Sequence, residues 1–264
     1  MLKYWLVFWL TIKEYFVYRI NFVIWRLRVF LNFLITFFLW EAVFEKQIRF
    51  GTYNKAEFIS YIFFANLIAN FVLGTRTVDI AGEIVNGEII NKLLKPISFF
   101  KYYLTRDLAD KTLNLVFVLF ELSLVITIFK PPLLLPSFNL VNILLFIFFF
   151  FLGTMISFYL SLIISFIGFW SHEVWGPRFI FMIVVFMLSG IYFPLDLLPK
   201  AAFNLFFLTP FPYLFYLPTQ VFFGRFYLLN FYIVFLGIFW FFLIGFVCFY
   251  LWRLGNRHYH FFGR

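Results

Sequence analysis

Long apolar runs rich in Phe, Leu and Ile recur along the chain, and they constrain its fold more than any other feature. A run of about 20 apolar residues is what a helix needs to cross the roughly 30 Å hydrocarbon core of a bilayer. The composition agrees, since 64% of the residues are hydrophobic and 12% are charged, whereas roughly 25% are charged in soluble chains. The sequence therefore predicts an all-α integral membrane protein. We expect one membrane domain over residues 1–264, because the runs and short connectors leave no room for a separate soluble domain.

Six transmembrane helices are predicted, at about residues 22–44, 58–75, 113–129, 140–169, 179–193 and 226–252. Residues 1–20 mix Trp5 and Trp9 with Lys and Arg at helical spacing and lack a small-residue cleavage site, which predicts an interfacial helix and not a signal peptide. Arg26 and Arg28 are expected to snorkel from the first span to the near interface. The fourth span, 140–169, would be roughly 45 Å long at 1.5 Å per residue and must tilt or protrude.

The fifth span is short because Pro194 ends it, which leaves roughly 22 Å of helix from residue 179. Five of the ten prolines lie between Ser189 and Gly224. That stretch is too apolar for an exposed loop and too broken for a straight helix. It is predicted to be a re-entrant or interfacial segment, with its backbone satisfied by protein or cavity water.

Small residues repeat every four positions in the fourth span, at Gly153, Ser157, Ser161 and Ser165. Such a ridge lets another helix approach closely. Helix packing is favoured over the alternative, a polar pathway.

The one long polar segment runs from Arg76 to Lys111. Within it, residues 84–95 place Val85, Ile89 and Leu93 on one face, which predicts a short amphipathic helix that Pro96 ends. Glu88 and Lys92 stand four apart, in the favourable order for a surface ion pair. An amphipathic linker lying on lipid headgroups is the alternative interpretation.

Lys and Arg in the connectors predict the orientation. The N-terminal segment, the 76–111 loop, Arg178 and the C-terminal tail carry fifteen of them, and the opposite side carries six. Since cytoplasmic loops are enriched in positive charge, both termini and the polar loop are expected in the cytosol and the proline-rich segment outside. The net charge of +9 suits contact with anionic membrane lipid. Nucleic-acid binding is disfavoured, because these charges flank apolar spans and form no single basic face.

The residues offer little catalytic chemistry. The chain contains no GxxxxGK[ST] motif for nucleotide phosphates, and His172 and Glu173 do not form HExxH. Cys248 is the sole cysteine, and His258 and His260 lie in the tail, so no metal site is expected. Glu121 is the acid farthest inside a span. It is open to two interpretations, a substrate or proton role or a carboxyl that is neutral or bonded to an Asn of a neighbouring helix.

The whole pattern resembles the membrane subunit of ABC type-2 exporters. The resemblance is carried by an N-terminal interfacial helix, six spans with cytosolic ends, GEIVNGEIINKLLKPIS at 82–98, and the broken apolar segment at 189–224. It implies a dimeric permease, formed with a second copy or a sibling permease, and a translocation path between the two chains. It also implies that the 84–95 helix couples to a separate ABC ATPase subunit, which would carry ATP and Mg²⁺, while this chain binds no cofactor. The residues expected to contact that ATPase are Glu83, Val85, Glu88, Ile89 and Leu93.

The residues agree with that resemblance, because a transporter without a nucleotide site needs an outside source of energy. Asn66, Asn70 and Glu121 are candidates for the wall of the path. An aromatic lining would suit lipid-like or amphipathic cargo. Two other classes stay open: a secondary transporter that uses Glu121 as an ion relay, and a membrane enzyme acting on lipid through His172, Glu173 and Arg178.

Overall fold

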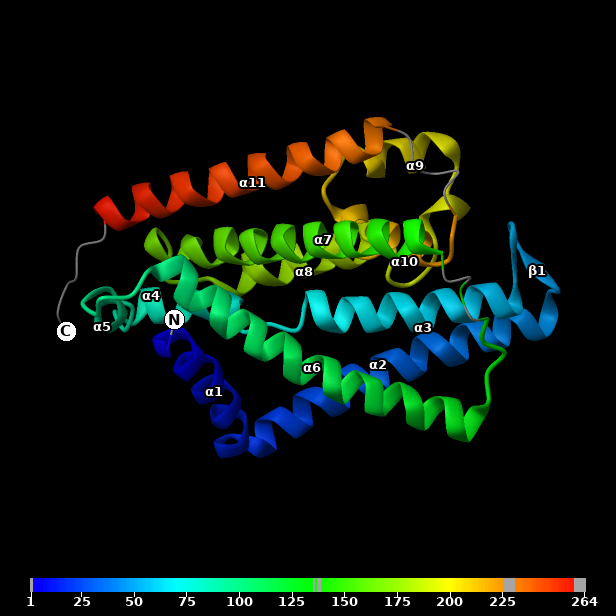
Figure 1. Ribbon diagram of the computed structural model, residues 1–264, viewed down its shortest axis with the longest axis horizontal. Helices are drawn as coiled ribbons and strands as arrows, with labels where there is room; N and C mark the ends of the chain where they lie inside the picture. The colour runs from blue at the N-terminus through cyan, green and yellow to red at the C-terminus, as the bar shows by residue number, and fades with distance from the viewer. Residues whose placement is uncertain (1, 135, 137–138, 226–230, 259–264) are drawn as a thin grey trace.

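The computed structural model describes residues 2–134, 136, 139–225 and 231–258 (Figure 1). Most of these residues form helices, whose long members run along the longest axis of the molecule. The elements in chain order are α1 (Leu2–Val17), α2 (Arg19–Lys46), β1 (Arg49–Phe50), β2 (Tyr53–Asn54), α3 (Lys55–Val72), η1 (Thr77–Asp79), α4 (Ile80–Val85), α5 (Ile90–Leu93), α6 (Phe99–Phe129), α7 (Leu140–Phe166), η2 (Ile167–Phe169), α8 (Trp175–Leu188), η3 (Leu195–Leu197), α9 (Lys200–Phe207), η4 (Phe211–Tyr213), α10 (Tyr216–Phe222) and α11 (Phe231–His258).

Five described helices are long and apolar enough to cross a membrane: α2, α3, α6, α7 continued by η2, and α11. The predicted fifth span corresponds to α8, whose 14 residues rise about 21 Å at 1.5 Å each. The count of six spans therefore depends on this short helix. The predicted third span, 113–129, lies within α6, a longer helix that begins at Phe99. The first residues predicted for the last span, 226–230, lie outside the described residues.

Helix α7 lies between α11 on one side and α3 with α10 on the other (Figure 1). Its small residues permit this close packing. A Cβ on Gly153 would lie 2.5 Å from the Tyr213 carbonyl oxygen. Ser157 donates a hydrogen bond to the Val72 carbonyl at 3.1 Å, and Ser165 donates one to the Thr77 carbonyl at 2.9 Å. Ser161 is buried on the same side.

The proline-rich stretch between α8 and α11 folds into η3, α9, η4 and α10. Residues 216–221 of α10 are all buried, and α10 packs against α7 and α3 in the main hydrophobic core. Tyr53 of β2 links two parts of this stretch. Its hydroxyl lies 2.9 Å from the Asp196 carboxylate of η3 and accepts from Gln220 Nε2 of α10 at 2.6 Å. Much of the proline-rich stretch is thus covered by other parts of the chain, as its apolar composition predicts.

A β-hairpin with two residues in each strand, β1 and β2, joins α2 and α3 at the end of the molecule opposite α4 and α5 (Figure 1). Gly51 supplies its positive φ of 60°, which glycine adopts without steric cost. Asn54 and Glu57 then form a capping box at the start of α3, which satisfies two amides that the first helical turn leaves unpaired.

The first helix, α1, packs along α6, and Lys3 donates to the carbonyl of Pro96, shortly before α6 begins, at 2.8 Å. Leu2, Trp5, Leu6 and Leu10 on its other side are more than half exposed.

Candidate functional site

The polar segment between α3 and α6 is two short helices, not one. The predicted helix over residues 84–95 is wrong, because Gly87 takes a φ of 77° and separates α4 from α5. A left-handed residue stops a helix, and Gly adopts it freely. The Ile89 amide then donates back to the Glu83 carbonyl at 3.1 Å, which folds α5 against the end of α4.

The apolar side of this segment is turned into the molecule. Ile80, Ile84 and Ile89 are buried in a second core cluster with Phe166 of α7 and Cys248 of α11. Ile89 is 0% exposed. The residue predicted to sit in a groove of a partner therefore anchors the segment to its own chain, whereas Leu93 is 38% exposed.

Glu83 is the centre of the polar contacts that fix α5. Its carboxylate accepts from the Tyr103 hydroxyl and forms an ion pair with Lys92. Arg106 approaches the other carboxylate oxygen, with Nη1 at 3.6 Å. The Glu88–Lys92 pair predicted from spacing is wrong, because the turn at Gly87 directs Lys92 toward Glu83. Burial lowers the pKa of Lys92, and the Glu83 carboxylate opposes that shift.

Arg76 and Asp110 form a second set of contacts beside the first. Asp110 accepts from the Arg76 backbone amide at 2.9 Å and from its guanidinium at 3.1 Å. The Tyr15 hydroxyl of α1 donates to the same carboxylate at 2.9 Å. Glu14 links the two sets, with 2.9 Å to Arg106 and 3.3 Å to Arg76. We call the residues Glu14, Arg76, Glu83, Lys92, Tyr103, Arg106 and Asp110 the ion-pair collar.

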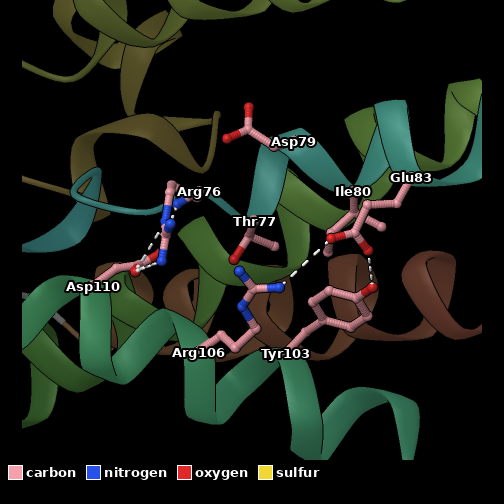
Figure 2. A pocket seen from close by; sticks show the side chains of 8 residues that line it. All are labelled: Arg76, Thr77, Asp79, Ile80, Glu83, Tyr103, Arg106 and Asp110. Carbon is pink, nitrogen blue, oxygen red and sulfur yellow. Dashed lines mark hydrogen bonds and ion pairs between the residues drawn. The ribbon is translucent and has the colours of Figure 1, made fainter. Parts of the chain in front are cut away.

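A small pocket opens within the collar, between η1, α4 and α6 (Figure 2). Figure 2 shows Tyr103 and Arg106 pointing at the Glu83 carboxylate from α6, while Arg76 reaches Asp110. The pocket holds about 30 Å³, which is space for about two water molecules. It is too small for a substrate, so we assign the collar a structural role in shaping the segment around it.

The outward side of the segment remains uncovered. Its exposed residues are Asn86, Glu88, Asn91, Leu93, Leu94, Lys95 and Pro96. Leu94 is 80% exposed, although it is a large apolar residue among polar ones. Of the residues predicted to contact an ATPase, Glu88 and Leu93 lie on this surface, Val85 is half-buried, and Glu83 and Ile89 face inward.

The three candidates for a translocation path lie together in a buried network around Arg26. Arg26 Nε donates to Glu121 Oε1 at 2.9 Å, and a second guanidinium nitrogen pairs with the other carboxylate oxygen. The same guanidinium donates to Asn70 and Asn114, both at 3.1 Å. Asn70 donates in turn to Asn66 Oδ1 at 2.9 Å. The predicted snorkelling of Arg26 is wrong, because its side chain is 5% exposed and bound on three sides.

The sequence did not predict one buried ion pair. Lys111 and Asp107 form an ion pair at 2.8 Å in α6, and both side chains are 0% exposed. In the part of the chain that the structure describes, Asp107 Oδ2 has no hydrogen-bond partner. Their four-residue spacing is a signal of a helical pair, but both residues fall in the segment predicted as a polar loop, whereas the structure includes them in α6.

Of the three residues considered for a lipid-modifying enzyme, Glu173 and Arg178 bind different partners. Glu173 accepts from the amides of Trp175 and Gly176 at the start of α8, while Arg178 pairs with Asp79 at 2.8 Å. Within the described ranges, no three or more His, Cys, Asp or Glu residues gather as they would around a metal ion. The tail histidines at 258 and 260 fall outside the side chains that the structure describes.

Five described helices of membrane-spanning length and composition define a multi-pass membrane protein. The comparison with known families then identifies which one. The family described as ABC-2 family transporter protein matches residues 30–263, and the chain belongs to that family. It is therefore an ABC-type permease. No curated protein sequence matches the chain.

Proposed function

We propose that this chain is the membrane-spanning subunit of an ATP-driven exporter, and that the outward side of α4 and α5 docks on a separate ABC ATPase. The partner would bind ATP and Mg²⁺, and two permease chains would enclose the path. The family membership supports the transport role. The observation that best supports the docking role is that α4 and α5 are anchored to their own chain by buried Ile80, Ile84 and Ile89, yet Leu93 and Leu94 are exposed.

The anchoring contacts make this surface suitable for transmitting force. Helix α4 packs against α7 and η2 with Ile84 buried, while Glu83 and Lys92 fix the segment to α6 through Tyr103. A push on a segment held at several points moves the helices that hold it. A flexible linker resting on headgroups would not need these buried contacts.

The docking surface we propose differs from the sequence-based one. Glu88, Leu93 and Leu94 would contact the ATPase, with Val85 at the edge, whereas Glu83 and Ile89 shape the segment from inside. An exposed apolar side chain entering a groove, surrounded by polar residues, is typical of interface anchors.

The cytosolic location of this end remains part of the proposal. It is supported by the charge distribution, in which α1, the 76–111 segment and the tail carry most of the Lys and Arg. Glu121 gives no support to a secondary transporter, because a carboxylate held by two bonds from Arg26 is poorly suited to repeated proton release.

Leu94→Asp tests the proposal, because it places a charge at the most exposed apolar residue of the segment. Losing an interface anchor costs about 2 kcal/mol or more, so ATPase retained per permease in a detergent pull-down should fall at least tenfold. Ile48→Asp is the matched control, since Ile48 is 91% exposed and lies near the hairpin at the opposite end of the molecule. Equal retention in both variants would contradict the docking role.

A further inference from the structure

Helix α2 carries a polar stripe on its exposed side. Asn21, Arg28 and Asn32 are all exposed, and they lie within about 20° of one line along the helix at 3.6 residues per turn. Arg26 points to the opposite side, into its buried network. Among the described residues, the side chains of Arg28 and Asn32 make no hydrogen bond or ion pair.

The stripe contrasts with the exposed sides of other spans. Helix α7 contains no charged residue from Leu140 to Phe166, and in α11 the first is Arg253. Their outward residues are those expected against lipid tails, such as Ile147, Phe242 and Phe246. Hydrocarbon therefore explains the outer surfaces of α7 and α11 and the exposed apolar residues of α2, such as Ile24 and Ile35, but not the three polar residues of the stripe.

The stripe extends too far along α2 for all three of its side chains to reach lipid headgroups. Arg28 has a long side chain that can extend toward an interface. Asn32 does not, and it sits midway between Arg19 and Lys46, about 20 Å of helix from either end. An amide facing hydrocarbon at that depth would lose its hydrogen bonds to water without replacement. Asn32 must therefore face water, another polar chain or a ligand.

Charge argues against close packing of α2 on its own copy. In a two-fold arrangement the same surface meets itself, so two Arg28 side chains would approach each other across the contact. Like charges facing each other in a partly dry interface are costly. A gap that holds water and an anion between the two stripes would give Asn32 a polar environment and would also separate the two Arg28 charges.

We propose that the Asn21–Arg28–Asn32 stripe lines the translocation path and that Arg28 binds the anionic headgroup of an amphipathic cargo. This inference rests on the proposed permease function. Arg28 would supply charge-assisted hydrogen bonds to a phosphate or carboxylate, and Asn32 would keep the path wet farther along α2. The Asn66–Asn70–Glu121 network is then a brace behind the path and not its wall.

Water access is tested by cysteine labelling in membrane vesicles that carry the full chain. Asn32→Cys and Ile147→Cys are each made with Cys248→Ser, and a charged, membrane-impermeant thiol reagent is added from both sides. We expect Asn32→Cys to react and Ile147→Cys, on the exposed apolar side of α7, to stay unmodified. An inert Asn32→Cys that reacts after denaturation would overturn the proposal.

Anion binding is tested on the purified full chain with dihexanoyl phosphatidic acid, and with dihexanoyl phosphatidylcholine as the probe of no net charge. Arg28→Gln should weaken binding of the acidic probe about tenfold or more, the loss expected for a charge-assisted hydrogen bond. Arg19→Gln is the matched control, since Arg19 is exposed on the opposite side of α2, and it should change binding less than twofold. Equal loss in both variants would contradict a specific site.

The two arms separate a path from surrounding lipid. Weaker binding in Arg28→Gln together with an inert Asn32→Cys would mean that Arg28 contacts lipid headgroups only, which overturns the path. Neither readout uses an ATPase. Suppose that Asn32→Cys stays inert and Arg28→Gln binds the acidic probe normally, while Leu94→Asp loses the ATPase as expected. The role of the stripe in the path would then be refuted, and the proposed permease function would stand.

Discussion

The collar around Glu83 and the network around Arg26 use the same residue types in different surroundings. Lys92 and Glu83 keep about a fifth of their side-chain surface exposed, at 20% and 19%, whereas Arg26 is 5% exposed and belongs to a membrane-spanning helix. Water can replace a lost partner in the collar, but little can replace one beside Arg26. The inner network therefore fixes the bundle of long helices, while the collar only sets the shape of a surface segment.

The largest effect is expected from Arg26→Leu. It removes the cation but leaves Glu121, Asn70 and Asn114 without their shared donor. Breaking a buried ion pair by removing one partner costs about 3–5 kcal/mol. The unfolding midpoint in detergent should fall sharply, and retention of ATPase should fall only as far as folded permease is lost. A variant as stable as the wild type would show that the network does not brace the bundle.

Glu121→Gln sharpens the same comparison with a smaller change. The amide oxygen can still accept from Arg26, but the charge on Arg26 loses its counterion. We expect a loss of stability that is less than that of Arg26→Leu, and transport per folded permease that is largely retained. Loss of transport with normal assembly and normal ATPase activity would instead give Glu121 a part in the mechanism.

A moderate effect is expected from Lys92→Ala in the collar. Lys92 joins α5 to Glu83 and donates to the Tyr103 hydroxyl at 3.2 Å. Because these groups are partly exposed, solvent offsets much of the loss, and we expect about 1 kcal/mol. Amide exchange in residues 86–95 should become faster while the spans keep their protection. The control is Lys95→Ala, at an exposed lysine of the same segment, which should leave exchange unchanged.

The smallest effect is expected from Gly82→Ala in α4. A Cβ at Gly82 meets nothing within 4 Å, and replacing Gly by Ala in a helix stabilises it by about 0.5–1 kcal/mol. Exchange in α4 should slow slightly and docking should persist. Gly153→Ala provides the contrast, because its Cβ would clash with the Tyr213 carbonyl in the core. Equal effects of the two changes would contradict the difference between the loosely and tightly packed regions.

The apolar spans could be predicted from sequence because run length and composition alone decide them. The long helices α2, α3, α7 and α11 lie close to where their runs predicted them. The start of α6 could not be predicted, because its first turns carry charges that pair inside the fold, such as Asp107 with Lys111. From sequence alone, a charged stretch is predicted to be an exposed loop, because the ion pairs that allow its burial are not visible.

The segment predicted to carry the coupling site, residues 84–95, has a different geometry from the predicted single helix. Val85, Ile89 and Leu93 share a helical periodicity, yet the positive φ at Gly87 breaks it and turns Ile89 inward. Arg26 and Glu121 are separated by 95 positions, so spacing gave no signal for their pairing. Periodicity describes one helix at a time, whereas the direction of an exposed surface depends on what the rest of the chain covers.

The central claim is that the outward side of α4 and α5, and not its buried side, contacts the ATPase. The most direct measurement is site-specific photo-crosslinking in intact membranes, with a benzophenone amino acid placed at Leu94, Ile89 or Ile48 in turn. We expect a permease–ATPase adduct from Leu94 and none from the buried Ile89 or the distant Ile48. Adducts from Ile48 but not Leu94, or lipid adducts alone at Leu94, would contradict it.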